Sequence, residues 1–173
     1  HFAKTPSVPN QNGLYLNSSL AGFTSGGNWI TELSSTRIAI TDGQVSSGSN
    51  RDDVVYSFKS VEGFSKIDSY VGNGSSNGTF VYTGFRPAWV IIKSTSGGRH
   101  WVIKDAVRNT YNVLNRTLLA NSNTSEDTSS SYDIDFLSNG FKCRTSSAHT
   151  NTNGETHVYM AFAEQPFKFS NAR

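Results

Sequence analysis

Short apolar stretches separated by Gly, Asn and Ser dominate the second half of the chain. Trp89 and Trp101 each precede a run of β-branched residues that ends in Lys, a pattern typical of strands. The polar residues 94–99 between these runs predict a hairpin loop. Because Val90-Ile91-Ile92 is continuously apolar, we expect residues 89–93 to be covered on both faces of their sheet. Further strands are predicted at 79–83, 100–105, 132–137, 141–145 and 156–163.

The turn at Ser138-Asn139-Gly140 separates two of these strands. Asn139-Gly140 favours the pair of positive φ angles that a type I′ turn needs, so a β-hairpin is predicted here. In the first half the strand signals are weaker and lie at 14–20, 37–41 and 54–58. Asp42-Gly43 predicts a second hairpin turn.

Helical periodicity is absent over any stretch longer than about ten residues. Polar segments at 121–131 and 146–154 are expected to be exposed loop tips. Strands spaced in this way are found in sandwiches and barrels. The pattern therefore predicts an all-β fold, most simply an antiparallel, jelly-roll-like β-sandwich.

Residues 14–67 and 112–169 share a similar order of apolar and polar positions, which suggests two related units of about 100 residues. The first unit lacks a counterpart of the Trp-containing hairpin at 88–105. We therefore expect an irregular lead-in at 1–13, an incomplete first unit at 14–71, a glycine-rich junction at 72–78 and a complete second unit at 79–173. The apolar sheet edge left by the missing hairpin is expected to pair with an upstream segment or a neighbouring protomer.

Composition narrows the classes of function. The net charge is +2 and no Lys/Arg run occurs, so no nucleic-acid partner is expected. The run Ala88–Ile92 is too short to span a bilayer, and no membrane insertion is expected. One cysteine, Cys143, excludes an internal disulfide and is expected to be a buried strand residue. Because residue 1 is His and no signal peptide is evident, the chain is expected to be a piece of a longer protein.

Ligand-binding candidates come from the loops. Trp29 lies in a glycine-rich loop where its ring is available to stack on a sugar, whereas Trp89 and Trp101 are expected to pack in the sheet. His149, Asn151 and Asn153 lie in the polar segment 146–154. Polar loops on a rigid β-scaffold commonly bind carbohydrate.

Catalytic and metal-binding signals are weak. Asp133 and Asp135 share a strand face, with Glu126 and Asp127 in the loop before them, and such carboxylates serve glycoside hydrolysis or calcium binding. A solvated strand face explains the same pattern more simply. His100 and His157 are expected to be structural. The sequence thus predicts no catalytic residues, no metal and no cofactor.

Several motifs resemble a domain repeated in tail and fibre proteins of tailed phages, notably marine phages. The motifs are Val61-Glu62-Gly63-Phe64-Ser65-Lys66, Tyr70-Val71-Gly72-Asn73-Gly74, 80–90, Arg108-Asn109 with Tyr111-Asn112, 135–142 and 159–164. The resemblance implies a virion structural or host-recognition module. It brings no catalytic residues with it.

Three functions follow as hypotheses. The first is a non-enzymatic tail-fibre or spike module, a homo-oligomer and most simply a trimer, which binds a cell-surface glycan or holds the fibre together. It would work outside the cell, as part of the virion, alongside other virion proteins. The second is a capsid or tail decoration protein without a ligand. The third is a polysaccharide depolymerase, which requires two or more of the four carboxylates to converge in a groove.

Overall fold

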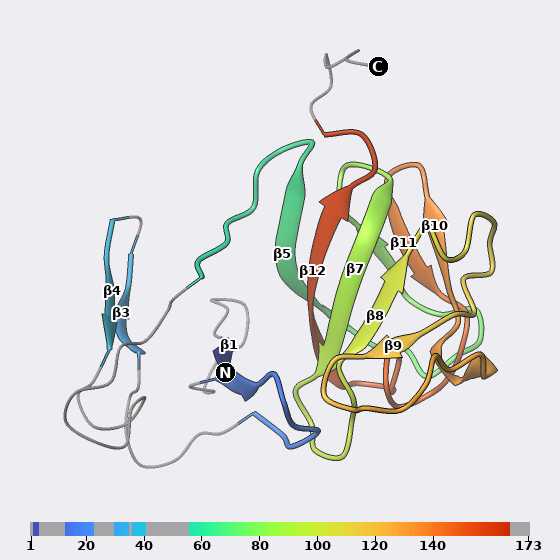
Figure 1. Cartoon of the computed structure of the whole chain (residues 1–173), viewed down its shortest axis with the longest axis horizontal. Helices are drawn as coiled ribbons and strands as arrows, with labels where there is room; N and C mark the ends of the chain where they lie inside the picture. The colour runs from blue at the N-terminus through green and yellow to red at the C-terminus, as the bar shows by residue number, and fades with distance from the viewer. Residues whose placement is uncertain (1, 4–12, 23–29, 35, 41–55, 167–173) are drawn as a thin grey trace.

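The computed structural model describes residues 2–3, 13–22, 30–34, 36–40 and 56–166 (Figure 1). Two antiparallel sheets form the main body and confirm the all-β prediction. The larger has the order β5-β12-β7-β8-β9, and the smaller has the order β10-β11-β6. Their strands are β5 (Ser65–Val71), β6 (Phe80–Tyr82), β7 (Pro87–Ser94), β8 (Val102–Asp105), β9 (Leu118–Leu119), β10 (Ile134–Leu137), β11 (Gly140–Cys143) and β12 (Thr156–Ala163).

Smaller elements complete the described part of the chain. β1 (Phe2–Ala3) pairs with β2 (Leu14–Tyr15), and β3 (Ile30–Leu33) pairs with β4 (Ile38–Ile40). One 3-10 turn, η1 (Ser130–Tyr132), is the helical element among the described residues.

A single apolar core joins the two sheets. Val90 and Ile92 alternate along β7 with side chains that point to the opposite face of the larger sheet, and both are fully buried. Ile134 and Phe136 do the same along β10, as the two-residue period of a strand requires. Aromatic rings from the two sheets pack against each other. For example, the ring centroids of Phe141 in β11 and Tyr159 in β12 are 5.3 Å apart. The two sheets therefore share this core.

Residues 13–22 cover the opposite face of the larger sheet. Leu14 is 2% exposed and packs with Ile91, Trp101 and Val158. The indole N–H of Trp101 donates a hydrogen bond of 2.8 Å to the carbonyl oxygen of Tyr15. The expectation that residues 89–93 are covered on both faces is confirmed, and Trp101 is a sheet-packing residue as predicted.

The hairpin at Ser138-Asn139-Gly140 is confirmed, but the expected role of its glycine is wrong. Leu137 pairs with Gly140, so Ser138 and Asn139 are the two turn residues and Gly140 begins β11. Gly140 does not have positive φ. A side chain at this position would collide with the carbonyl oxygen of Val81, which explains why glycine is needed in the strand.

The strand predictions for the second half are otherwise confirmed, and β12 has the expected bounds. In the first half the observed strands are shorter than predicted: β2 lies within the predicted range 14–20, and β4 lies within 37–41. Residues 56–58, the described part of the strand expected at 54–58, form no strand, and Tyr56 and Phe58 are exposed. The predicted turn at Asp42-Gly43 lies outside the described residues.

β5 was not expected from the sequence, yet it pairs with β12 along its whole length, from Val71 opposite Thr156 to Ser65 opposite Phe162. The glycine-rich residues 72–78 therefore connect a strand of the larger sheet to β6 of the smaller one. The two-unit repeat is not confirmed, because much of residues 14–67 lies outside the described part of the chain.

Candidate functional site

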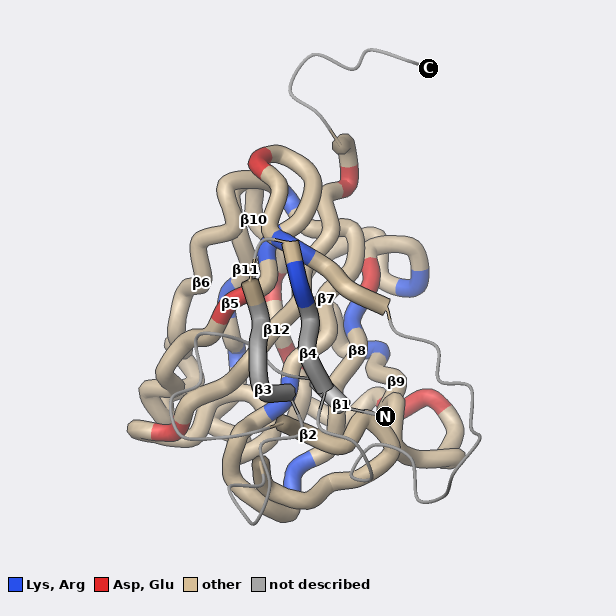
Figure 2. Tube along the Cα trace, turned by 90° about the vertical axis from the view of Figure 1, so that its left-hand side faces the viewer, with Lys and Arg blue, Asp and Glu red and all other residues tan. Residues whose placement is uncertain are grey.

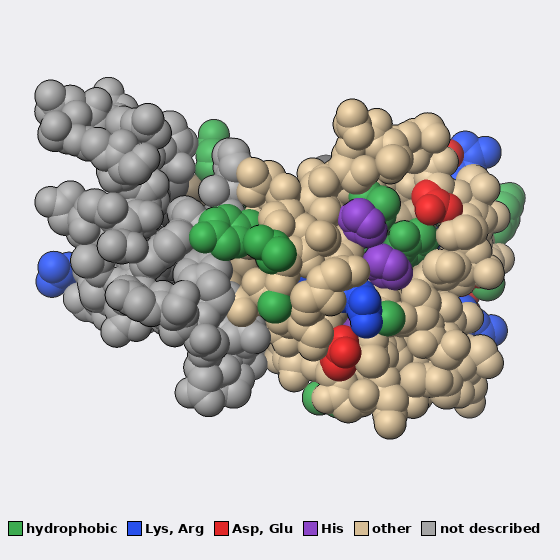
Figure 3. Space-filling model, turned by 90° about the horizontal axis from the view of Figure 1, so that it is seen from below, with side chains coloured by type: hydrophobic (Ala, Val, Ile, Leu, Met, Phe, Trp, Pro, Cys, Tyr) green, Lys and Arg blue, Asp and Glu red, His purple; other side chains and the backbone are tan. Residues whose placement is uncertain are grey.

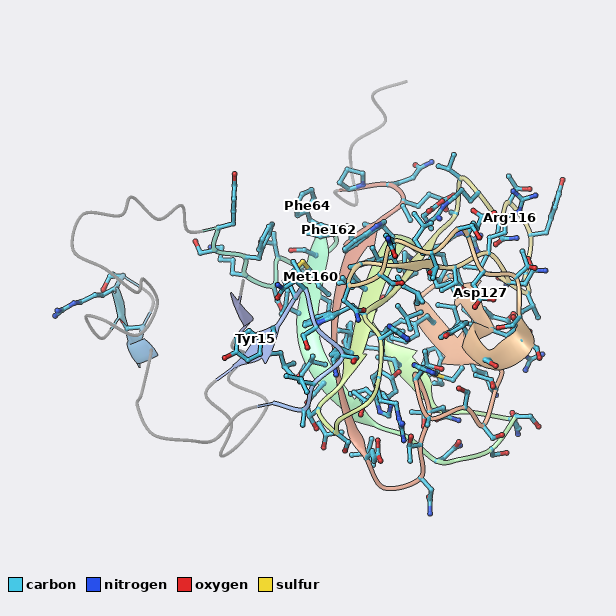
Figure 4. The ribbon with its side chains drawn as sticks, turned by 60° about the horizontal axis from the view of Figure 1, so that its bottom comes forward. Tyr15, Phe64, Arg116, Asp127, Met160 and Phe162 are labelled. Atoms are coloured by element: carbon cyan, nitrogen blue, oxygen red, sulfur yellow. The ribbon has the colours of Figure 1, made fainter. Side chains whose placement is uncertain are left out.

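Loops beside β8 and β9 surround an open hollow of about 490 Å³. Its lining residues combine an imidazole, apolar and phenol groups with hydroxyls and carboxylates: His100, Leu119, Thr124, Ser125, Glu126, Asp127, Thr128 and Tyr132. Figure 4 shows Asp127 and Arg116 at the end of the molecule away from Tyr15. The hollow meets the covering segment only near His100, where Arg99 N–H donates to the carbonyl oxygen of Ser19 at 3.2 Å.

Backbone pairing and ion pairs hold the loop 121–131 in place. Thr117 and Asp127 exchange two backbone hydrogen bonds of 2.8 and 2.9 Å. The Glu126 carboxylate lies 3.4 Å from Nη1 of both Arg108 and Arg116. Arg108 also pairs with Asp105 at the end of β8. The loop is therefore held next to the larger sheet through Glu126 and Asp127.

A buried lysine supports the same region from inside. Lys104 of β8 is fully buried, and its ammonium donates hydrogen bonds to the carbonyl oxygen of Leu114 and to Oγ1 of Thr117, at 2.9 and 2.6 Å. Burial lowers its pKa to about 8, opposed by the nearby carboxylates of Asp133 and Asp127. Lys104 thus ties residues 114 and 117 to β8.

Two histidines stack beside the hollow. The rings of His100 and His149 are 5.4 Å apart with an interplanar angle of 14°, and Tyr132 packs against His149 at 4.9 Å. Figure 3 shows two histidine side chains side by side on this face. The three rings come from three separate segments, so the stack joins the loops that border the hollow.

Hydrogen bonding assigns the protonation of this pair. The backbone N–H of His100 donates to Nδ1 of His149 at 3.2 Å, which requires that nitrogen to be unprotonated. Nδ1 of His100 lies 3.1 Å from the amide nitrogen of Asn121, which can only donate. Burial, then the neighbouring His100, lowers the pKa of His149 to about 4. Its imidazole is therefore neutral at physiological pH, in agreement with its bonding.

The rim of the hollow offers acceptors and hydroxyl groups. Asp127 Oδ1 accepts a hydrogen bond of 2.7 Å from the backbone N–H of Ser129. Hydrogen bonds from the Ser129 backbone and side chain lower the pKa of Asp127, so this carboxylate is charged. Thr124, Ser125 and Thr128 add hydroxyls nearby. The arrangement suits a ligand that carries many hydroxyl groups of its own.

The structure places the predicted ligand-binding residues at different sites. His149 lies beside the hollow, in contact with Tyr132 and His100. Asn151 is fully buried, and its amide nitrogen donates to Asn73, Ser75 and Thr145 while its oxygen accepts from the Asn73 N–H. Asn151 therefore holds two loops together and has no surface for a ligand, which corrects the prediction.

The segment 146–154 is likewise not the exposed tip that was expected, because Thr150 and Asn151 have no exposed surface. Asn153 is exposed and lies against Gly74, among residues that do not line the hollow. Trp29 lies outside the described residues. His100, Tyr132 and Thr128 were missed as site residues. The polarity of 121–131 marked it as a loop, but nothing in the sequence shows that it folds beside residue 100.

The four candidate carboxylates divide into two groups. Glu126 and Asp127 line the hollow, whereas Asp133 and Asp135 do not. Asp135 is 8% exposed and pairs with Arg144 at 3.0 Å. Burial raises the pKa of Asp133, countered by Lys104. The structure therefore does not bring all four carboxylates to one groove.

Metal-binding and thiol groups are the other candidates for chemistry in the described part of the chain. There, no group of three or more His, Cys, Asp or Glu side chains is placed to hold a metal ion. Cys143 is fully buried, as expected, and burial raises the pKa of its thiol to about 11. None of the helices described is long and apolar enough to cross a membrane.

Fold and site together define an all-β domain of two main antiparallel sheets with a polar hollow formed by its loops. The chain belongs to the family described as a domain of unknown function (DUF7483), whose model matches residues 3–166. Comparison with curated proteins and with solved structures gave no match.

Proposed function

We propose that this protein is a non-catalytic module of a phage virion, part of a tail fibre or spike, that binds a cell-surface glycan in the hollow beside β8 and β9. The sequence resemblance to phage tail and fibre domains supports the virion context. In this proposal the module lies on the outside of the virion, in a homo-oligomer. One observation carries the glycan-binding part: the hollow combines ring and apolar groups with hydroxyls and a charged carboxylate.

The physical argument concerns what such a lining binds. A saccharide presents C–H faces that pack on apolar and aromatic groups, and hydroxyls that both donate and accept hydrogen bonds. His100, Leu119 and Tyr132 supply the first kind of surface. Asp127 and the loop hydroxyls supply the second. Because the loop is anchored by its bonds to Thr117 and to two arginines, little ordering is required on binding.

A glycan array followed by titration of the best binding glycan tests this proposal. Asp127→Asn keeps an oxygen for the Ser129 N–H but removes the charge, and Thr124→Val removes one hydroxyl at nearly constant volume. Each is expected to weaken binding by about 3- to 10-fold. Thr110→Val, at an exposed position outside the hollow, is the control and should leave the affinity unchanged.

Two results would overturn the glycan-binding proposal. One is a folded protein that binds no glycan, which favours a decoration protein without a ligand. The other is binding that neither substitution weakens. New reducing ends after incubation with host polysaccharide would favour a depolymerase instead and would contradict the non-catalytic assignment.

A further inference from the structure

The edge strands of the two main sheets differ in whether their outward backbone groups are hydrogen-bonded within the chain. An edge strand presents unpaired backbone N–H and C=O groups, which invite another strand to pair with it. The two main sheets have four such edges, formed by β5, β9, β10 and β6. Three of them are closed by other parts of the same chain.

β5 is closed at Ser65, Ile67 and the carbonyl oxygen of Val71 by side chains and a turn. Ser65 exchanges two backbone hydrogen bonds of 2.9 Å with Val61. Ser60 Oγ accepts from the N–H of Ile67 at 2.9 Å and donates to its carbonyl oxygen at 3.2 Å. Thr79 Oγ1 donates to the carbonyl oxygen of Val71 at 2.9 Å. This edge is therefore closed to an incoming strand.

The β10 and β9 edges are closed in the same manner. Asn112 acts as a substitute strand for β10: its side-chain oxygen accepts from the N–H of Phe136, and its amide nitrogen donates to the Phe136 carbonyl oxygen, both at 2.9 Å. The Leu114 N–H donates to the carbonyl oxygen of Ile134 at 2.8 Å. At the β9 edge, Thr117, just before the strand, exchanges two backbone hydrogen bonds with Asp127, and the carbonyl oxygen of Leu119 accepts from the N–H of Ser122 at 3.1 Å.

β6 is the exception. Val81 is the residue whose backbone faces β11, since the flanking Thr79 and Thr83 bond to that side, accepting from Cys143 N–H and donating to the Asn139 carbonyl oxygen. The backbone N–H and C=O groups of Phe80 and Tyr82 therefore point away from the sheet. Within the described residues these four groups have no partner. The side chains of Phe80 and Tyr82 are 43% and 65% exposed.

β6 itself carries no charge that would repel a like strand, and the nearest charged side chain in the sheet is Lys142 of β11, opposite Phe80 on the inner side. Residues 69–85 contain no Asp, Glu, Lys or Arg. Arg86, the next charged residue, is paired with Glu164 at 2.8 Å. Figure 2, which shows the side of the molecule with β5 and β6, has no charged segment on β6. The lysines and prolines that commonly protect an edge are thus missing from this strand.

We propose that β6 is an interface between two copies of this chain, which pair through β6 in antiparallel orientation about Val81. In that register Phe80 lies opposite the partner's Tyr82, and Tyr82 lies opposite the partner's Phe80. All four outward backbone groups of each copy then find partners, giving four hydrogen bonds. The same register places two aromatic cross-strand pairs on one face of the joined sheet.

Self-complementarity is what selects a second copy as the occupant. An interface of this kind is isologous and has two-fold symmetry, so the two three-stranded sheets become one continuous sheet. Because β6 has three residues, the contact is small and the association is expected to be reversible. This inference is independent of glycan binding, because no residue of β6 lines the hollow.

Sedimentation velocity over a dilution series tests the proposal. The chain is expected to show a reversible equilibrium between monomer and dimer. Tyr82→Lys removes both aromatic cross-strand pairs and places two like charges diagonally across the interface, so it is expected to weaken dimerisation by at least about 10-fold. Tyr111→Lys, at another exposed tyrosine, should leave the dimerisation constant unchanged.

Phe80→Lys provides a second variant at the same edge, with an expected effect equal in direction. Unfolding midpoints close to that of the unmodified chain show that the variants are folded, as exposure of both aromatic side chains implies. A chain that is monomeric at every concentration would overturn the proposal. So would a dimer that neither edge variant weakens, or a trimer with β6 left free.

Discussion

β10 and β6 flank the same strand, β11, yet only one of them remains open at its outer edge. At β10, Asn112 and Leu114 occupy the outward groups of Phe136 and Ile134. At β6, the outward groups of Phe80 and Tyr82 bind nothing in the described part of the chain. The two strands themselves are both short and apolar. The difference therefore comes from loops elsewhere in the chain. The bonds at β10 stabilise the folded chain, whereas the free groups at β6 are available for association.

Asn112→Ala is expected to have the largest effect, because it opens the closed β10 edge. The substitution leaves the backbone N–H of the fully buried Phe136 without its partner. The free energy of unfolding should fall by about 2 to 3 kcal/mol in urea titration. Asn123→Ala, at an exposed loop position, is the control and should change it by less than about 0.5 kcal/mol. Equal effects of the two substitutions would show that Asn112 does not close the edge.

Like Asn112, His149 uses its side chain to bind a backbone group, but the imidazole can be protonated. Its Nδ1 accepts a hydrogen bond from the backbone N–H of His100, just before β8. The pKa is about 4 in the folded protein and about 6.5 when unfolded. The unfolded state thus binds more protons between these values, and stability falls as pH falls through that window. We expect a loss of about 1 to 2 kcal/mol, reduced by partial solvent exposure.

His149→Asn tests this pH dependence, because Oδ1 replaces Nδ1 as an acceptor but does not titrate. Urea unfolding between pH 6.5 and about pH 4 should show a shallower decline for the variant. A remaining slope is expected from His157, whose pKa burial also lowers. An unchanged slope would contradict the role assigned to His149.

Ser60→Ala should have the smallest effect. Its hydroxyl closes β5 at Ile67, but the bonds are exposed to solvent, and water can replace them. The expected loss of stability is about 0.5 to 1 kcal/mol in urea titration. Ser76→Ala, in the exposed residues before β6, is the matched control and should be neutral. A loss as large as that of Asn112→Ala would remove the distinction between buried and exposed closures.

The main strands could be predicted because each buries a regular apolar face. β12 has the predicted bounds, and β7 and β8 form the predicted hairpin. β5 could not be predicted, because Ser65, Lys66, Asp68 and Ser69 make it polar and its register is imposed by pairing with β12. Pairing partners distant in the chain override weak local preference.

The candidate site was harder to predict for the same reason. Residues 124–128 were recognised as a polar loop, but His100 and Tyr132 meet them only through the folded arrangement of β8 and β9. Asn151 is of a residue type that often binds ligands, but its side-chain amide donates hydrogen bonds to Asn73 and Thr145 instead. Asn112 closes β10 across 24 residues of sequence, a role that no local pattern indicates.

Amide hydrogen exchange, resolved by residue over a dilution series, tests the contrast between closed and open edges most directly. The N–H groups of Phe136 and Ile67 should be protected at every concentration, because the chain itself binds them. Those of Phe80 and Tyr82 should exchange rapidly when dilute and become protected as the concentration rises, while Val81 stays protected throughout. Rapid exchange at Phe80 and Tyr82 at all concentrations, or protection that does not depend on concentration, would contradict the account.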